Sequence, residues 1–177
     1  MTTERIAAAL GRLETVLRRR PTFAEHEDKP AIARWQGGTR FTVRPAQGDL
    51  EILTDLPAEL GGDGEGITPG WLMRAGLAAC AASSIRLQAA VEGIELESLE
   101  ATASSRSDVR GLLGMTDESG VPTPTGYGEV RLLVRVSAPG VARERLQALI
   151  ERANALSPVA NALQRASAIR LSIELQD

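Results

Sequence analysis

A long helix built from small apolar residues is the feature that most constrains how this chain folds. Thr68 is suited to cap a helix and a proline follows it, so the sequence predicts a helix over Pro69–Val91. From Leu72 to Ala82 the segment is apolar on nearly every side apart from Arg74, which indicates burial on most faces. Six small residues would let another element approach its backbone closely: Ala75, Gly76, Ala78, Ala79, Ala81 and Ala82. We therefore expect a central, tightly packed helix that ends at Gly93.

Strand-like and helical patterns surround this helix. The predicted strands are Ala31–Trp35, Thr39–Val43, Leu50–Thr54, Ile94–Ser105, Tyr127–Ser137 and a final strand over Ile169–Leu175. The predicted outer helices are Thr3–Arg20, Val141–Leu156 and a short one that restarts at Ser157-Pro158. The glycine-rich segment 61–66 reads as a mobile connector. Strands, a buried helix, strands, a helix pair and a strand in this order predict an α+β fold with antiparallel sheets.

The length of 177 residues and a hydrophobic content of 43% allow one sizeable core. We expect residues 1–29 to form an N-terminal helix and connector, and residues 30–177 to form the α+β domain. His26 lies in the charged run that ends at Pro30, so we expect it to be exposed.

Composition and charge exclude several classes of function. A net charge of −3 without a long basic run argues against nucleic-acid binding. No apolar stretch approaches the roughly 18 to 20 residues that span a bilayer, and the N-terminus lacks a secretory core, so we expect a cytoplasmic protein without a membrane partner. One cysteine and one histidine predict neither an internal disulfide nor a His/Cys zinc site, and we expect no metal or cofactor. Any redox chemistry must use a single thiol.

That thiol belongs to Cys80, in the middle of the predicted central helix. A mid-helix thiol gains little from the helix dipole, so a cation must stabilise its reactive thiolate form. Arg74 points to a different side of the helix, whereas Gly76 and Ser84 share the face of Cys80, and Ser84 is a possible hydrogen-bond donor. The alternative is that Cys80 is an inert core residue, as small buried cysteines often are.

Two stretches carry a family resemblance. One is LPAELGGDGEGITPGWLMRAGLAACAASSIRLQAAVEGIE, residues 56–95, and the other is GYGEVRLLVRVSAPGVARERLQALIERANALSPVANAL, residues 126–163. In their joint order of double glycine, proline-started helix, single cysteine, strand, helix and closing helix, they resemble the OsmC/Ohr family of osmotically inducible and organic hydroperoxide resistance proteins.

The resemblance implies an intertwined homodimer with buried helices at its centre and thiol peroxidase activity toward organic hydroperoxides. Cys80 matches the family's peroxide-attacking cysteine. Arg40 is the best match to the arginine that stabilises the thiolate, and Arg44 is the second choice; Arg110 is a weaker candidate from a loop. Ser157 stands in place of the second, disulfide-forming cysteine.

The glutamate that the resemblance places near the start of the central helix is also missing, because Gly70 and Trp71 stand there. A serine hydroxyl cannot form a disulfide with a sulfenic acid, so Ser157 departs from the family's chemistry. Its simpler interpretation is an N-cap of the closing helix.

Three functions remain open from the sequence. The first is a one-cysteine organic hydroperoxide reductase in oxidative stress response, with an external thiol as reductant. The second is an inactive dimer that binds a small apolar ligand in a pocket lined by Trp71, Leu72 and Met73. The third is a structural protein that uses its N-terminal helix as the contact element.

Overall fold

The predicted central helix is α2, Pro69–Val91, in a computed structural model that describes residues 2–165 and 167–175. The hydroxyl of Thr68 caps it by accepting the backbone N–H of Trp71 at 3.2 Å. Gly93 follows its end with a φ of +66°, a left-handed conformation that glycine adopts without strain. Both predicted helix boundaries are confirmed.

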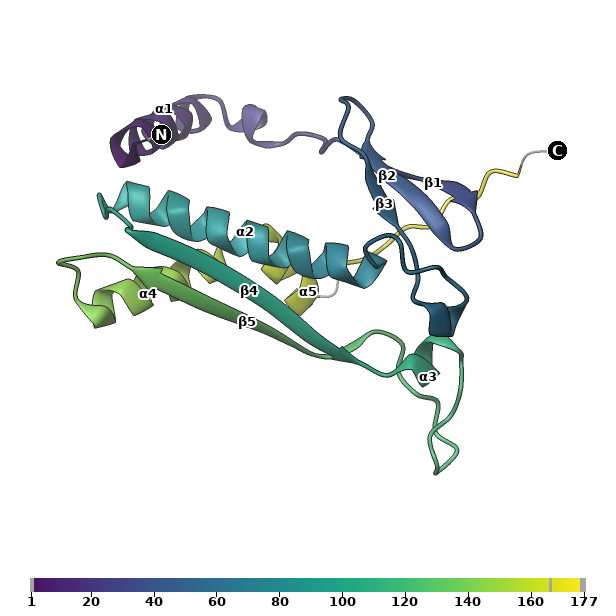
Figure 1. Cartoon of the computed structure of the whole chain (residues 1–177). Helices are drawn as coiled ribbons and strands as arrows, with labels where there is room; N and C mark the ends of the chain where they lie inside the picture. The colour runs from purple at the N-terminus through teal and green to yellow at the C-terminus, as the bar shows by residue number, and fades with distance from the viewer. Residues whose placement is uncertain (1, 166, 176–177) are drawn as a thin grey trace.

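The meander before α2 forms a three-stranded antiparallel sheet in the order β1-β2-β3. Its strands are β1 (Ala31–Gly37), β2 (Arg40–Pro45) and β3 (Ile52–Thr54). Figure 1 shows this sheet projecting beyond the end of α2 at which the helix begins. Trp35 and Phe41 on the sheet are exposed, so other elements of the same chain leave part of its surface uncovered.

A second sheet pairs β4 (Ser98–Ser107) with β5 (Tyr127–Ser137) and runs along α2 (Figure 1). Leu132, Val134 and Val136 of β5 are half-buried, as the alternation predicts. Arg131 and Arg135 occupy the other face, where they pair with nearby carboxylates in solvent. The prediction of a strand with one buried face is therefore confirmed.

The remaining helices are α1 (Thr3–Arg19), α3 (Val109–Leu112), α4 (Arg143–Ala155) and α5 (Pro158–Arg165), with 3₁₀ turns at Pro21–Ala24 and Ala58–Leu60. Helices α1, α4 and α5 all contact α2. The core lies where α2, α4 and the β4–β5 sheet meet, around Ile85, Ala89, Leu149 and Ala153. The fold is α+β, as predicted.

One face of α2 is left open by its own chain. Gly76, Ala79, Ser83 and Leu87 are exposed, and they recur at helical spacing on one side of the helix. The opposite side, including Leu77, Ala81 and Ile85, is buried. The expectation of burial on most faces is therefore not met within a single copy, whose sheet and helices cover one side.

The predicted final strand is not formed in the described residues 167–175. Its four alternating apolar residues are almost fully exposed, from 72% for Ile173 to 94% for Ile169. Alternation predicts a strand with one buried face, but a strand also needs a neighbouring strand to bond. Within this single copy, no such neighbour pairs with the segment.

Candidate functional site

The only thiol of the chain is paired with a buried hydroxyl. Ser157 immediately precedes α5 and is fully buried, and its Oγ donates a hydrogen bond to Sγ of half-buried Cys80 at 3.3 Å. The backbone carbonyl of Ser157 accepts the N–H of Asn161 in the first turn of α5. Ser157 therefore begins the hydrogen-bond pattern of α5 through its backbone carbonyl, whereas its side-chain hydroxyl donates to the sulfur of Cys80.

Contact between α2 and α5 brings these two residues together. They are 77 positions apart, so no local pattern in the sequence could reveal the pairing. Ser84, the hydrogen-bond donor suggested by helical register, lies one turn beyond Cys80 and is half-buried. In the structure the hydrogen bond to the sulfur comes from Ser157 instead.

The two arginines expected to stabilise the Cys80 thiolate, Arg40 and Arg44, bind other groups in the structure. Arg40, at the start of β2, pairs with Glu65 at 3.3 Å and with Asp63 at 3.8 Å. Arg44 donates to the carbonyl of Pro45. In the part of the chain that the structure describes, neither arginine forms a hydrogen bond with Cys80.

Arg110 is engaged locally in the short helix α3. It forms an ion pair with Asp108 at 2.6 Å, and the hydrogen bond and charge of that carboxylate raise the pKa of Arg110. The same pair lowers the pKa of Asp108, mainly through the hydrogen bond from the guanidinium. Arg110 is therefore engaged in a surface pair with Asp108, the residue that caps α3.

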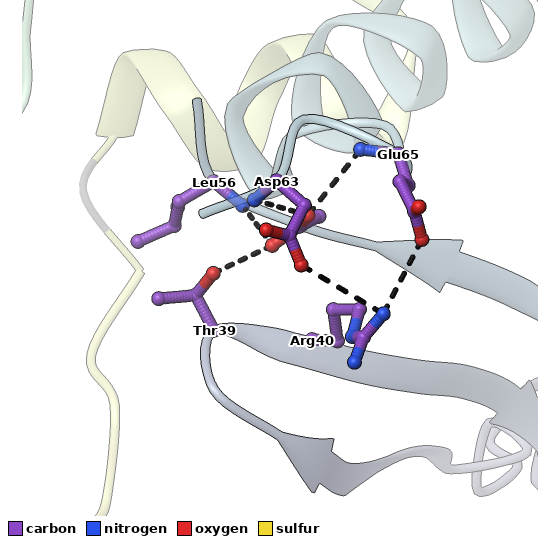
Figure 2. Close-up of polar contacts among 6 residues, drawn as sticks. Thr39, Arg40, Leu56, Asp63 and Glu65 are labelled. Carbon is purple, nitrogen blue, oxygen red and sulfur yellow. Dashed lines mark hydrogen bonds and ion pairs between the residues drawn. The ribbon is translucent and has the colours of Figure 1, made fainter. Parts of the chain in front are cut away.

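A buried carboxylate that the sequence did not single out organises the chain before α2 (Figure 2). Asp55 is only 1% exposed, and its Oδ1 accepts the hydroxyl of Thr39 at 2.5 Å and the N–H of Leu56 at 2.8 Å. Its Oδ2 accepts the N–H groups of Asp63 and Glu65 at 3.0 and 3.3 Å. The Thr39 hydrogen bond, assisted by these backbone donors, lowers the pKa of Asp55 against the opposing effect of burial.

Two glycines let the connector wrap tightly around Asp55. A side chain at Gly62 would collide with the carbonyl of Leu56, and one at Gly66 would lie 2.7 Å from the carbonyl carbon of Thr54. The segment that the sequence predicted to be a mobile connector is thus tied to the end of β3 by short contacts and hydrogen bonds. Its ordered path presents Asp63 and Glu65 to Arg40 (Figure 2).

The acidic partner of Arg40 therefore comes from the connector and not from the first turn of α2. A side-chain carbon added at Gly70 would lie 3.0 Å from the hydroxyl of Tyr127, so that position has little room for a glutamate. Glu65 lies four residues before α2 and supplies a carboxylate to the arginine. The expectation that the chain lacks an acidic partner for this arginine is therefore wrong.

The residues expected to line an apolar pocket lie on the first turn of α2. Trp71 is 49% exposed, while Leu72 and Met73 are half-buried. Cavities lie further along α2 and are lined by its residues from Leu77 onward, for example by Leu77, Ala82 and Leu87. Among the described helices, none is both long and apolar enough to cross a membrane.

Comparisons with known proteins agree on one family. The family model described as "OsmC-like protein" matches residues 62–172. An organic hydroperoxide resistance protein of Xanthomonas axonopodis pv. citri (strain 306) is 28% identical over 134 residues, which cover 75% of this chain and 84% of that protein.

Solved structures give the same result. An organic hydroperoxide resistance protein from Legionella pneumophila is 29% identical, with a TM-score of 0.54 over 78% of this chain and 92% of that one. Another from Elizabethkingia anophelis is 26% identical, with a TM-score of 0.58 over 79% and 90%. An OsmC-like protein from Mycoplasma pneumoniae, 19% identical with a TM-score of 0.63 over 79% and 89%, shares the fold.

Proposed function

The chain belongs to the family of OsmC-like proteins, and from this premise we propose that it reduces organic hydroperoxides with a single cysteine, Cys80, and an external thiol. The hydrogen bond between Ser157 and Cys80 carries the proposal. It joins the position of the peroxide-attacking cysteine to the position at which the resemblance expects a second cysteine. A serine there keeps the two side chains in contact but supplies no second sulfur.

The proposed reaction begins with the thiolate of Cys80. Its sulfur attacks the terminal oxygen of a hydroperoxide, so an S–O bond forms and the O–O bond breaks. The hydroperoxide is reduced to an alkoxide, which takes a proton and leaves as an alcohol, while the cysteine is oxidised to a sulfenic acid. The Ser157 hydroxyl is placed to donate to the sulfur in its charged form, and hydrogen bonds to charged groups are the stronger ones.

Regeneration requires two equivalents of a small thiol. The first thiol attacks the sulfenic sulfur, forms a mixed disulfide and releases water; the second attacks the mixed disulfide, frees the thiolate of Cys80 and leaves as the oxidised disulfide. The balance is one hydroperoxide and two thiols consumed, with one alcohol, one water and one disulfide formed. The proposal places the protein in the cytoplasm, where low-molecular-weight thiols are kept reduced.

Arg40 is proposed to act across the interface of a homodimer. Its guanidinium is oriented by Glu65 and Asp63, and its sheet projects from the rest of its own chain (Figure 1). An arginine so placed would approach the Cys80 thiolate of a second copy and not the thiolate of its own chain. Arg44 lies four residues further along the same strand and is the second choice.

Two exposed surfaces support the homodimer. The open side of α2 carries Gly76, Ala79 and Ser83, which would allow the helix of a second copy to approach closely. The exposed apolar residues of the C-terminal segment need a strand neighbour that their own copy does not give them within the described residues. Pairing of two copies would cover both surfaces.

We further propose that residues 1–29 are an addition to an OsmC-like domain over 30–177.

The test is consumption of cumene hydroperoxide with dithiothreitol as reductant. Wild type should consume the peroxide, Cys80→Ser should not, and Arg40→Ala should lose most of the activity. Arg131→Ala is the matched control, because Arg131 also lies on a strand in an ion pair with a carboxylate but on a solvated face.

Equal consumption by wild type and Cys80→Ser would reject the enzyme. The alternative is then a family member without catalysis that binds a small apolar ligand. Binding of apolar ligands to the wild type and to variants of Trp71, Leu72 and Met73 would test this alternative.

A further inference from the structure

The buried carboxylate of Asp55 is hydrogen-bonded to each of the residues that determine where Arg40 lies (Figure 2). Its Oδ1 accepts the hydroxyl of Thr39, the residue directly before Arg40 in the chain. Its Oδ2 accepts the backbone N–H groups of Asp63 and Glu65, whose side chains pair with Arg40. Asp55 thus joins the strand that carries the arginine to the loop that carries its two acidic partners.

These acidic partners hold Arg40 by one end of its guanidinium. Glu65 Oε2 lies 3.3 Å and Asp63 Oδ2 lies 3.8 Å from the same nitrogen, Nη1. Among the residues that the structure describes, Nε and Nη2 of Arg40 form no hydrogen bond. Because a guanidinium carries five N–H donors, an arginine held in this way keeps donors for a second anion, such as a thiolate.

The ion pairs of Arg40 need a loop whose backbone is fixed. Asp63 and Glu65 are exposed, and a pair between exposed charges contributes little when holding it costs side-chain and backbone freedom. Four of the six residues in 61–66 are glycines, which would leave an unbonded loop with many conformations. The two backbone hydrogen bonds to Asp55 remove that freedom at the positions from which the acidic side chains reach Arg40.

We propose that Asp55 is a positioning residue for the thiol chemistry of this protein. By fixing Thr39 and the loop, it holds Arg40 where Nε and Nη2 can reach the Cys80 thiolate of a second copy. This role rests on the proposed peroxidase function, and it is assigned to a residue that touches neither the thiol nor the peroxide. An Asp55 that only stabilises the fold would change the free energy of unfolding and leave the reactivity of Cys80 in the folded protein unchanged.

The test is the second-order rate constant for oxidation of Cys80 by cumene hydroperoxide. It is measured on the full-length protein as loss of free thiol without reductant, at a temperature at which thermal melts show each variant to be folded. Asp55→Asn should lower the rate constant by about tenfold to a hundredfold, the range expected when a reacting group is slightly misplaced. Arg40→Ala should lower it at least as much.

The double variant separates positioning from a general effect on the fold. Asp55→Asn introduced into Arg40→Ala should change the rate constant by less than about twofold, because the residue through which Asp55 acts is already absent. Asp117→Asn is the matched control. Asp117 also accepts two backbone N–H groups of a loop, those of Ser119 and Val121, but it has no link to Arg40. Its variant should react as wild type does.

Thr39 gives a second route that leaves the carboxylate in place. Thr39→Val removes the hydroxyl that Asp55 accepts and should lower the rate constant in the wild-type background but not in Arg40→Ala. Thr39→Ser keeps a hydroxyl and should restore most of the rate. Thr42→Val makes the same change further along β2 and should have no effect. These variants decide the matter if Asp55→Asn does not fold.

Three results would overturn this role of Asp55. A rate constant that is unchanged in folded Asp55→Asn would leave the carboxylate a purely structural role. An equal loss in the wild-type and Arg40→Ala backgrounds would show that Asp55 acts through the fold and not through Arg40. Arg40→Ala that reacts as wild type does would remove the residue on which Asp55 acts.

All three results would leave the proposed peroxidase function in place, because Cys80 of the wild type would still be oxidised. A wild type whose Cys80 is not oxidised would instead reject that function, and the positioning role of Asp55 would fall with it.

Discussion

The hydroxyl of Ser157 lies 3.3 Å from the sulfur of Cys80 and donates a hydrogen bond to it from a fully buried position. A hydroxyl in this position satisfies its own donor through the sulfur, and such a hydrogen bond is stronger when the acceptor is charged. The same position would hold a second sulfur in reach of the first. In the proposed reaction, the residue at 157 therefore decides whether the sulfenic acid of Cys80 is resolved by a second cysteine of the same chain or by an external thiol.

Ser157→Cys should convert the one-cysteine protein into a disulfide-forming one. A cysteine at this position would place its sulfur beside the sulfenic acid of Cys80, and only a small movement would bring the two to disulfide bonding distance. After one equivalent of cumene hydroperoxide, intact-mass measurement should show the loss of two hydrogens and no free thiol. Retention of a stable sulfenic acid in Ser157→Cys would contradict the geometry.

Ser157→Ala should slow the reaction of Cys80 with a thiol-alkylating reagent. Loss of a hydrogen bond to a charged group costs on the order of 1.5 kcal/mol, which corresponds to about a tenfold lower rate. Iodoacetamide labelling at neutral pH, followed by mass spectrometry, measures it. Ser84→Ala is the control and should react as wild type does; an equal effect of both variants would assign the change to helix packing.

Asp55→Asn should destabilise the protein at neutral pH but not in acid. The pKa of Asp55 is lowered from its usual 3.8 by its hydrogen bonds, so its contribution to stability is present above pH 3.8 and is lost as the pH falls through the lowered value. An amide cannot accept all of the donors that the carboxylate accepts. Thermal melts should therefore differ by several degrees at pH 7 and converge in acid. A difference that is independent of pH would contradict this assignment.

The C-terminal segment should be required for the proposed homodimer. Leu171→Asp with Ile173→Asp places charges on the apolar face of the alternating segment and should convert a dimer to a monomer in light scattering coupled to size exclusion. Ser172→Asp changes the opposite face and should leave the dimer intact. A dimer in all three proteins, or a monomeric wild type, would reject this role.

Local patterns in the sequence predicted much of the fold. The limits of α2 follow from Thr68 and Gly93, and β5 follows from an alternation that places Val134 inside and Arg135 outside. The features that were missed depend on distant residues. Asp55 accepts hydrogen bonds from a preceding hairpin and a following loop, and no periodic pattern or motif in the sequence marks this role.

The candidate site was predictable only in part. Cys80 stands out as the single thiol, but its contact with Ser157 arises from the packing of α5 on α2. The partner of Arg40 was sought inside the helix and lies in the connector before it. The final strand was predicted from alternation alone, which cannot say whether its neighbour belongs to the same copy.

The central claim is that Cys80 itself takes up the peroxide oxygen. The most direct measurement is mass spectrometry after treatment with one equivalent of cumene hydroperoxide in the presence of dimedone, which traps sulfenic acids. The account predicts one dimedone adduct on Cys80 in wild type, its disappearance when excess dithiothreitol is present, and no adduct in Cys80→Ser. An unmodified Cys80 in wild type with the peroxide left intact would contradict it.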